Sequence, residues 1–458
     1  MSRFLWLCGA CFVLLACGDD TSGSGGDGES GDGGSPGSGA GSPGGGSDPV
    51  GGSLAVGGGQ AGGGGPTALA CDPLAAPSGA VIDVGPSDSA NLASIVGDAA
   101  AGTTLRFAAG TYAVPGILQL RQAGVTIRSA DDDAGSVIFD GGYTVPEIFQ
   151  VNANDVTIAH VTVTHAVDHL VHVSTAGQGE DVTGFRLYGV RMIDSGEQFL
   201  KVNPGGDGGY VDAGRVECST FEMTAEGRQH VESCCGGCYT GGIDTHSGRG
   251  WVVAGNRFEG IHCENGGLAE HAIHFWRGAR DTVVEDNTII DCARGVGFGL
   301  AGGQNRTYSD DPYPGLDIAH YDGVIRNNVI YASNDFFDTG VELQSARTPL
   351  VIHNTVVTPG GAAFFSSIDC RFPETNALVV NNLTTRITTR DSATADFQSN
   401  LEETPLSYFA DEAGHDFHLT DAATDALGQG VPNPDAGLDI DGQAHDATTP
   451  DRGADEHP

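Results

Sequence analysis

A short pattern of apolar and polar positions recurs along the second half of the chain. Two or three apolar, mostly β-branched residues precede a polar pair that ends in Asn, and a second short apolar run follows the Asn. The pattern occurs five times, closing at Asn256, Asn287, Asn328, Asn354 and Asn382. Spacings of roughly 26 to 41 residues predict a solenoid, in which each repeat packs against its neighbours.

The apolar runs are only three to six residues long and are separated by Gly, Asn and Asp. Runs of this length favour strands over helices. Each repeat is therefore predicted to be one coil of a β-solenoid, with the Asn at the same corner of every coil. Stacked amide side chains can hydrogen-bond to one another, and Asn tolerates the left-handed backbone conformation that a sharp corner requires.

The first coils are predicted at residues 104–112, 124–129 and 137–142, which read Leu-Arg-Phe with Gly-Thr-Tyr, then Val-Thr-Ile, then Phe-Asp-Gly-Gly. These segments resemble the N-terminal coils of right-handed parallel β-helix proteins of the pectate-lyase superfamily. The resemblance covers about residues 78–400. It implies an all-β fold, a right-handed parallel β-helix with loop insertions and a C-terminal cap. Because this fold carries lyases, hydrolases, epimerases and adhesins, it does not fix the activity.

The chain divides into four parts. Residues 1–17 resemble a bacterial lipoprotein signal peptide, which implies lipidation of Cys17 and a place in the cell envelope, on the periplasmic or the cell-surface side of the outer membrane. An ordinary secretory signal is the alternative. Residues 18–66 are nearly all Gly, Ser, Asp and Pro, which predicts a flexible tether. The β-helix domain is expected over 67–404, and an acidic segment over 405–458 is expected to cover the last open coil.

The chain carries 60 acidic and 21 basic residues, a net charge of −39. This charge argues against nucleic acid and bare anionic membranes as partners. We expect a monomer whose partner is a polysaccharide.

Cysteines that follow Cys17 are even in number, which in an exported protein favours disulfides, although the pairing cannot be deduced. They are Cys71, Cys218, Cys234, Cys235, Cys238, Cys263, Cys292 and Cys370. A metal site built from Cys218 and the Cys234–Cys238 cluster is the alternative.

A second set of strands is predicted to stack in a different sheet. These strands lie at residues 170–173, 199–202, 242–246, 271–276, 296–299, 340–343 and 364–369. Alternation of side chains along each strand then places polar residues in one outward row, with rungs about 4.8 Å apart. The predicted row contains His172, Lys201, Asp244, His246, His274, Gly297, Gly299, Glu342, Ser367 and Asp369.

This row suggests β-elimination from a uronate polysaccharide, which needs a base, an acid and a positive group beside the carboxylate. Candidate catalytic residues are Lys201, Asp244, His246, His274, Arg249 and Arg277. Lys201, His246 or His274 would be the base, and an arginine or Ca²⁺ would hold the carboxylate. Candidate substrate-binding residues are Trp276, which could stack on a sugar, Gly297 and Gly299, which would leave a hollow, and Glu342 and Asp369.

Two other functions fit the same pattern. A non-catalytic glycan-binding or adhesive protein would need no base or acid. A glycoside hydrolase could use Glu342 and Asp369, because adjacent rungs bring them near the ~5–5.5 Å of retaining enzymes. An ion pair between Asp369 and Arg371 is the alternative for that carboxylate. Insertions at 203–240 and 303–321 are expected beside the binding face, and the acidic tail could bind Ca²⁺.

Overall fold

The computed structural model describes residues 71, 73–175, 179–206, 208–234 and 237–458. The predicted signal peptide with Cys17 and the predicted tether lie outside the described residues. In the described part, no helix is both long and apolar enough to cross a membrane.

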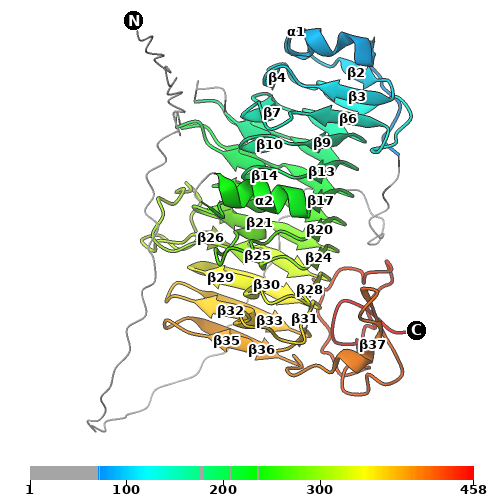
Figure 1. Ribbon diagram of the computed structural model, residues 1–458. Coiled ribbons are helices and arrows are strands. Elements are labelled where there is room, and N and C mark those ends of the chain that lie inside the picture. The colour runs from blue at the N-terminus through cyan, green and yellow to red at the C-terminus, as the bar shows by residue number, and fades with distance from the viewer. Residues whose placement is uncertain (1–70, 72, 176–178, 207, 235–236) are drawn as a thin grey trace, which may run out of the picture. The chain divides into compact units, whose positions relative to one another are not determined.

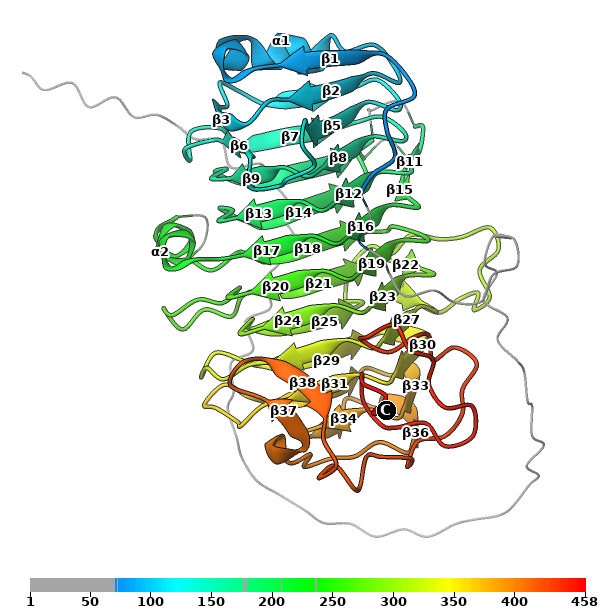
Figure 2. The same cartoon turned by 90° about the vertical axis from the view of Figure 1, so that its right-hand side faces the viewer.

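From β1 to β36 the chain winds as a right-handed parallel β-helix, which confirms the predicted all-β fold (Figures 1 and 2). Each complete coil contributes one strand to each of three parallel sheets, called A, B and C here. The helix α1 (Leu92–Gly97) follows a 3-10 turn at Pro86–Asn91 and buries Leu92 and Val96 against the first coil.

Sheet A contains the Asn-pattern strands. Its strands are β1 (Val81–Val84), β2 (Thr104–Phe107), β5 (Thr126–Ser129), β8 (Thr157–Ala159), β12 (Arg186–Tyr188), β16 (Arg215–Glu217), β19 (Val252–Ala254), β23 (Val283–Glu285), β27 (Val324–Arg326), β30 (Ala346–Ile352), β33 (Asn376–Val380) and β36 (Thr394–Gln398), with β22 (Ala279–Arg280) and β26 (His320–Tyr321) on a short branch.

Sheet B contains the apolar runs that follow the corner. Its strands are β3 (Gly110–Ala113), β6 (Val137–Asp140), β9 (Thr162–Thr164), β13 (Arg191–Ile193), β17 (Thr220–Glu222), β20 (Arg257–Glu259), β24 (Thr288–Ile290), β28 (Val329–Tyr331), β31 (Thr355–Val357) and β34 (Leu383–Thr384).

Sheet C contains the second predicted set of strands. Its strands are β4 (Leu118–Leu120), β7 (Glu147–Val151), β10 (His169–Ser174), β14 (Gln198–Asn203), β18 (Gly241–His246), β21 (His271–Trp276), β25 (Arg294–Phe298), β29 (Thr339–Gln344), β32 (Ser366–Arg371) and β35 (Ile387–Thr389). Small two-stranded sheets are formed by β11 (Val182–Thr183) with β15 (Val211–Asp212), and by β37 (Phe409–Asp411) with β38 (Asp416–Leu419).

The core is a set of aliphatic columns, because equivalent residues of successive coils pair directly. In sheet A one such column runs through Leu105, Ile127, Ile158, Leu187, Val216, Val253, Val284, Ile325, Val351 and Val379, all of them buried. Short β-branched runs suit this arrangement, since each side chain packs on the one above and the one below.

The predicted asparagine column is confirmed and continues to Asn400. In each step, the Oδ1 atom of the lower Asn accepts hydrogen bonds from the backbone N–H and the Nδ2 of the Asn above, at 2.8 to 3.0 Å. We call Asn256, Asn287, Asn328, Asn354, Asn382 and Asn400 the Asn ladder.

The expected left-handed corner lies one residue before the ladder position, and not at the ladder Asn itself. The preceding residues all have a positive φ; they are Gly255, Asp286, Asn327, His353, Asn381 and Ser399. The left-handed residue turns the chain, and the ladder Asn that follows can then point its amide inward along the stack.

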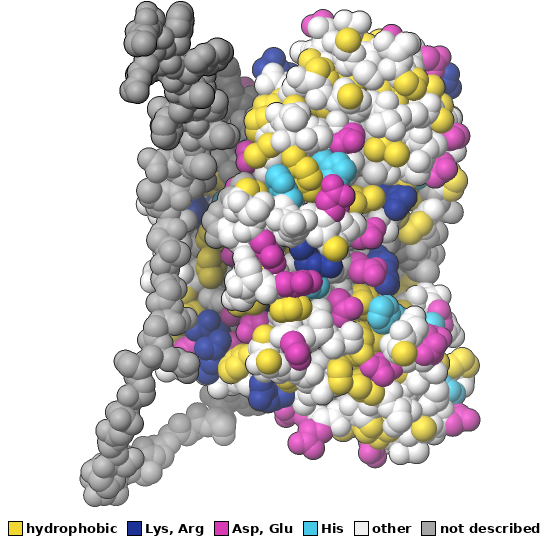
Figure 3. Space-filling model, viewed as in Figure 1, with side chains coloured by type: hydrophobic (Ala, Val, Ile, Leu, Met, Phe, Trp, Pro, Cys, Tyr) yellow, Lys and Arg dark blue, Asp and Glu magenta, His cyan; other side chains and the backbone are white. Residues whose placement is uncertain are grey.

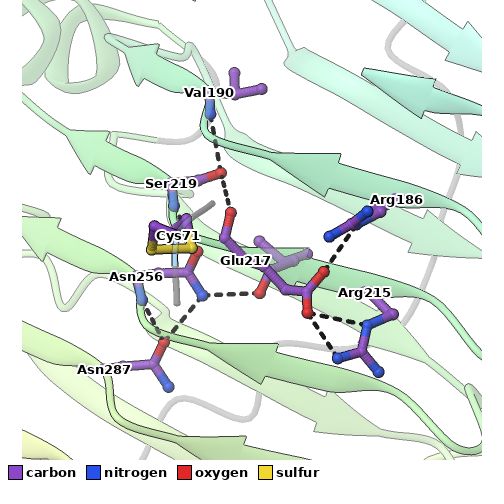
Figure 4. The surroundings of a disulfide bond; sticks show 10 residues. Cys71, Arg186, Val190, Arg215, Glu217, Ser219, Asn256 and Asn287 are labelled. Carbon is purple, nitrogen blue, oxygen red and sulfur yellow. Dashed lines mark hydrogen bonds and ion pairs between the residues drawn. A yellow bond between two sulfur atoms is a disulfide. The ribbon is translucent and has the colours of Figure 1, made fainter. Parts of the chain in front are cut away.

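The first predicted insertion is shorter than expected. Residues 211–222 continue the coils as β15, β16 and β17, and the segment that follows, with α2 (Ala225–Ser233), leaves the repeat. In that coil Ser219 takes the ladder position, with its N–H donating to Asn256 and its hydroxyl accepting from Val190 N–H (Figure 4). The sequence pattern missed this coil because Ser replaces Asn.

Two disulfides, Cys71–Cys218 and Cys238–Cys263, confirm the preference for disulfides. The alternative metal site is wrong, because Cys218 and Cys238 are bonded to different partners. The Cys71–Cys218 bond ties the segment before the first coil to the corner beside Glu217, which pairs with Arg186 and Arg215 (Figure 4).

The C-terminal segment packs against sheet B, and its covering of the last open coil stays a prediction. Figure 2 shows β37 and β38 beside the lower coils. Their Phe409, Phe417 and Leu419 pack in one cluster with Val329 and other residues of sheet B. Further along, the segment runs over the Asn corner, where Asn381 Nδ2 donates to the Val431 carbonyl. The apolar surface of sheet B therefore decides where the segment binds.

Three buried histidines make stability depend on pH. Burial lowers the pKa of His169, His320 and His353 to about 3, against about 6.5 in an unfolded chain. Between these values the unfolded chain binds more protons, so folding stability falls as pH falls, by up to ~1.4 kcal/mol per pH unit for each group.

Two half-buried carboxyls oppose this trend above pH ~4, because partial burial raises the pKa of Asp286 and Glu197 to about 7. Below pH ~4 these two carboxyls are protonated in both the folded and the unfolded chain and no longer oppose the histidines. We therefore expect the steepest loss of stability between pH ~4 and ~3. Urea midpoints measured at a series of pH values check this expectation. A flat profile from pH 5 to 3 would contradict it.

Candidate functional site

The polar row predicted on the second sheet exists in the expected register. Paired residues of successive sheet C strands are Gln119, Gln150, His172, Lys201, Asp244, His274, Gly297, Glu342, Asp369 and Thr388. We call this column the polar row. Its strands lie one below another along the coil stack in Figure 1.

The polar row is not the open stripe that the alternation suggested. Lys201, Asp244 and His274 are only 5%, 6% and 3% exposed. Long side chains of neighbouring rungs lie against one another, so each polar group is covered by its neighbours in the row and by adjoining insertions. A ligand can therefore reach the row only where a partly exposed residue borders it.

Lys201, Asp244 and His246 form the most compact polar group of the row. The Lys201 ammonium donates to Asp244 Oδ2 at 2.6 Å and lies 3.3 Å from His246 Nε2. His246 Nε2 is also 3.3 Å from Asp244 Oδ2. An Nε2–H that donates to this carboxylate leaves the lone pair of the imidazole on Nδ1.

The charges of this group follow from burial and pairing. Burial would lower the pKa of Lys201, but Asp244 raises it above its ordinary value. Burial opposes ionisation of Asp244, yet Lys201 and His246 hold the pKa of this carboxyl well below its usual range. Burial lowers the pKa of His246 more than Asp244 raises it. Lys201 is thus a cation and His246 a neutral imidazole at pH 7, which disfavours Lys201 as the base.

Tyr239 borders this group and was missed by sequence reasoning. It lies in the insertion that precedes β18, is 43% exposed, and interacts with the Lys201 ammonium. Burial raises the pKa of its hydroxyl, which therefore keeps its proton at neutral pH. No pattern in the sequence marks this tyrosine, because only the path of the insertion brings it to Lys201.

Trp276 and His274 stand at the next rung. Trp276 Nε1–H donates to Asp244 Oδ1 at 2.6 Å, and its ring stacks on His274 with centroids 5.5 Å apart. The Arg277 guanidinium lies 4.7 Å from the Trp276 ring centroid. Trp276 thus ends β21 with its ring 4.5 Å from that of His246 between centroids, and Arg277 follows it in the chain.

The hollow predicted at Gly297 and Gly299 is absent. The His271 ring covers Gly297, where a Cβ would lie 2.8 Å from His271 Nε2. Gly299 has a φ of +82° and a Cβ there would lie 2.0 Å from the Gln344 carbonyl oxygen. These glycines make room for a side chain and for the backbone of the next coil, and not for a sugar.

Glu342 and Asp369 pair on adjacent rungs, as predicted. Asp369 is fully buried and accepts from Arg390 at 2.9 Å, so its ion pair is with Arg390 and not with Arg371. Arg371 lies 3.5 Å from Glu342. Burial opposes ionisation of Glu342, but His271 holds its pKa well below the usual range. A glycosidase general acid needs the opposite shift.

Arg249, the other arginine considered for holding a substrate carboxylate, lies outside the polar row. Ser247 has a φ of +60° and turns the chain out of sheet C, so that Arg249 pairs with Arg280 in an isolated bridge. Its guanidinium donates to Asp281 at 2.9 Å and to Asp310 at 3.3 Å. The two carboxylates therefore already accept from the guanidinium N–H groups that Arg249 would need for a bidentate contact to a substrate carboxylate.

Acidic side chains are spread over the surface seen in Figure 3, with Lys, Arg and His side chains between them. The net charge of −39 opposes the approach of an anionic polymer. Binding of an anionic polymer would therefore depend on local cations such as Lys201 and Arg277, because the overall electrostatic potential of the protein is unfavourable.

Residues 147–384 match the family described as right handed beta helix region. Similar solved structures include pectate lyase Pel9A, with a TM-score of 0.44, 14% identity, and 83% of this chain and 97% of that chain covered. An alginate lyase from Paenibacillus sp. str. FPU-7 has a TM-score of 0.40 and 15% identity, with 70% of this chain and 99% of that chain covered. The surface adhesin PfbA of Streptococcus pneumoniae has a TM-score of 0.44 and 9% identity, with 70% of this chain and 98% of that chain covered. These identities concern the fold alone. A search of curated protein sequences found no match.

Proposed function

The chain belongs to the right-handed β-helix family, and from the group around Lys201 we propose that it is a lyase that cleaves a uronate-containing polysaccharide by β-elimination. One observation carries the proposal. A buried cation, Lys201, lies within 3.3 Å of the neutral imidazole of His246 and next to the hydroxyl of Tyr239. A positive group, a base and an acid are the three requirements of the reaction.

In the proposed reaction, Nδ1 of His246 takes the proton from C5 of the uronate. The electron pair of the C5–H bond forms a C4–C5 double bond, and the C4–O bond breaks. Tyr239 gives its hydroxyl proton to the leaving oxygen, and both side chains return to their starting states by exchange with solvent. Lys201 offsets the negative charge that spreads onto the carboxylate. Ca²⁺ stays the alternative source of that positive charge.

Two further parts of the proposal concern placement. We propose that Cys17 is lipidated and that residues 18–66 hold the domain away from the membrane of a bacterial envelope. The sequence features of the leader support this placement, and cell fractionation with mass analysis of the N-terminal peptide tests it.

A second candidate, a glycan-binding or adhesive protein, is favoured by one observation. Six of the ten residues of the polar row are buried and four are half-buried, and several of the side chains hydrogen-bond within the row, as in a ladder that only supports the sheet. Such a protein would bind the polymer at partly exposed residues and leave it intact.

Replacing Tyr239 by Phe tests the enzyme directly. We expect turnover of a uronate polysaccharide, followed by the absorbance of the new double bond, to fall about 10²–10⁴-fold, because the leaving oxygen loses its acid. Tyr313→Phe is the matched control, since Tyr313 lies in the other insertion and its hydroxyl contacts Thr348. Binding without any double-bond absorbance in the wild-type protein would favour the second candidate. Release of reducing ends without that absorbance would indicate a hydrolase.

A further inference from the structure

Three potential metal ligands converge at the start of β21. Glu270, His271 and His274 each offer a ligand atom, and these atoms lie within 4.8 Å of one another. Glu270 Oε2 is 4.0 Å from His274 Nδ1, and the two imidazole rings have centroids 4.5 Å apart. Figure 1 shows β21 at the middle of the stack, so the neighbouring coils hold this strand on both sides.

Both imidazoles have their Nε2 atoms occupied. His271 Nε2 lies 3.1 Å from Glu342 Oε2, and His274 Nε2 lies 3.1 Å from the Gly299 carbonyl oxygen. The opposite nitrogen of His271, Nδ1, is buried and has no hydrogen-bond partner, in a side chain that is 2% exposed. Buried polar atoms without a partner are rare in folded proteins and call for an explanation.

We propose that Glu270, His271 and His274 bind a divalent transition metal ion of the Zn²⁺ type, with the two histidines coordinating through Nδ1. Two imidazoles and one carboxylate are a donor set that suits Zn²⁺ and its first-row neighbours. Ca²⁺, which prefers oxygen ligands alone, is disfavoured at this position. Three protein ligands leave a further position for water or a ligand group.

The surroundings are those of a metal site. Metal-bound imidazoles usually donate their other N–H to a carboxylate or a carbonyl, which fixes the ring and raises its basicity. Glu342 and the Gly299 carbonyl occupy these positions. Bonds of about 2.0–2.1 Å require ligand atoms roughly 3.4 Å apart. Glu270 is 37% exposed, so its carboxylate can move by the small distance needed and gives the ion a path from solvent.

The test uses Co²⁺ as a visible probe and the full chain in a His418→Ala background. His418, Asp441 and Asp455 form another convergent group in the C-terminal segment, and this substitution removes its imidazole. We expect one Co²⁺ per chain with a d–d absorption band, which Zn²⁺ displaces. Glu270→Gln should weaken Co²⁺ binding at least ~10-fold.

Glu197→Gln is the matched control. Glu197 precedes β14 as Glu270 precedes β21, and it lies 3.7 Å from the buried His169, but among the residues that the structure describes no third ligand converges there. Binding by this variant should equal that of the background. The proposal is overturned if no band forms at any Co²⁺ concentration, or if Glu270→Gln binds as tightly as Glu197→Gln. The readout needs no substrate, so it is independent of the proposed lyase activity.

Discussion

Substitution of Asn328, an interior member of the Asn ladder, by Ala is expected to destabilise the coil stack strongly. Asn328 Nδ2 donates to the Val284 carbonyl and to Asn354 Oδ1, and its Oδ1 accepts the N–H and the Nδ2 of Asn287. Alanine would remove these four hydrogen bonds and leave the Asn287 N–H without its acceptor, whereas Asn354 Oδ1 would keep the Asn328 N–H and Asn287 Nδ2 would keep the Val253 carbonyl. Since each hydrogen bond contributes about 0.5–1.5 kcal/mol and a buried N–H without a partner adds a further cost, the free energy of unfolding should fall by at least ~3 kcal/mol.

Chemical denaturation measures this loss, and hydrogen exchange locates it, because a solenoid can open around one coil. We expect faster exchange in β23, β27 and β30. Asn400→Ala is the control, since Asn400 ends the ladder and is only half-buried, so about 1 kcal/mol should be lost there. Equal losses for the two variants would mean that the ladder does not act as a continuous hydrogen-bonded column.

The register of the polar row could be read from the sequence because it follows from two simple rules. Strand side chains alternate, and a one-residue shift would have turned the charged positions into the apolar core of the coils. Lys201, Asp244, His274 and Glu342 therefore lie in one column even though insertions of different length separate them. The same local reasoning placed the ladder asparagines at one corner.

Contacts that depend on the path of a loop or the reach of a side chain could not be read in this way. Tyr239 meets Lys201 only because of how its insertion folds, and His271 fills the space over Gly297 only because its ring leans along the row. The alternation of side chains along a strand predicts which face of the sheet a residue lies on. It does not predict whether loops or neighbouring side chains cover that face. The C-terminal segment binds beside sheet B for a similar reason, since its apolar residues match an outer surface that strand patterns do not describe.

Replacement of Lys201 by Met should abolish lyase turnover, a loss of at least ~10³-fold, because the positive group beside the carboxylate is removed. The same change should lower the free energy of unfolding by about 3–5 kcal/mol, because it leaves the buried Asp244 carboxylate without its 2.6 Å partner. Double-bond absorbance measures the first effect and urea unfolding the second. A loss of activity alone could therefore reflect instability, so a second variant is required.

The double variant Lys201→Met with Asp244→Asn separates the two effects. It removes both charges of the buried pair, and replacing a whole pair is often nearly neutral for stability. We therefore expect unfolding close to that of the wild-type protein, with turnover still absent. Wild-type turnover in the double variant would show that Lys201 takes no part in the reaction. A stable double variant that binds the polymer and does not cleave it would show that turnover is lost with the charge of Lys201 and not through unfolding of sheet C.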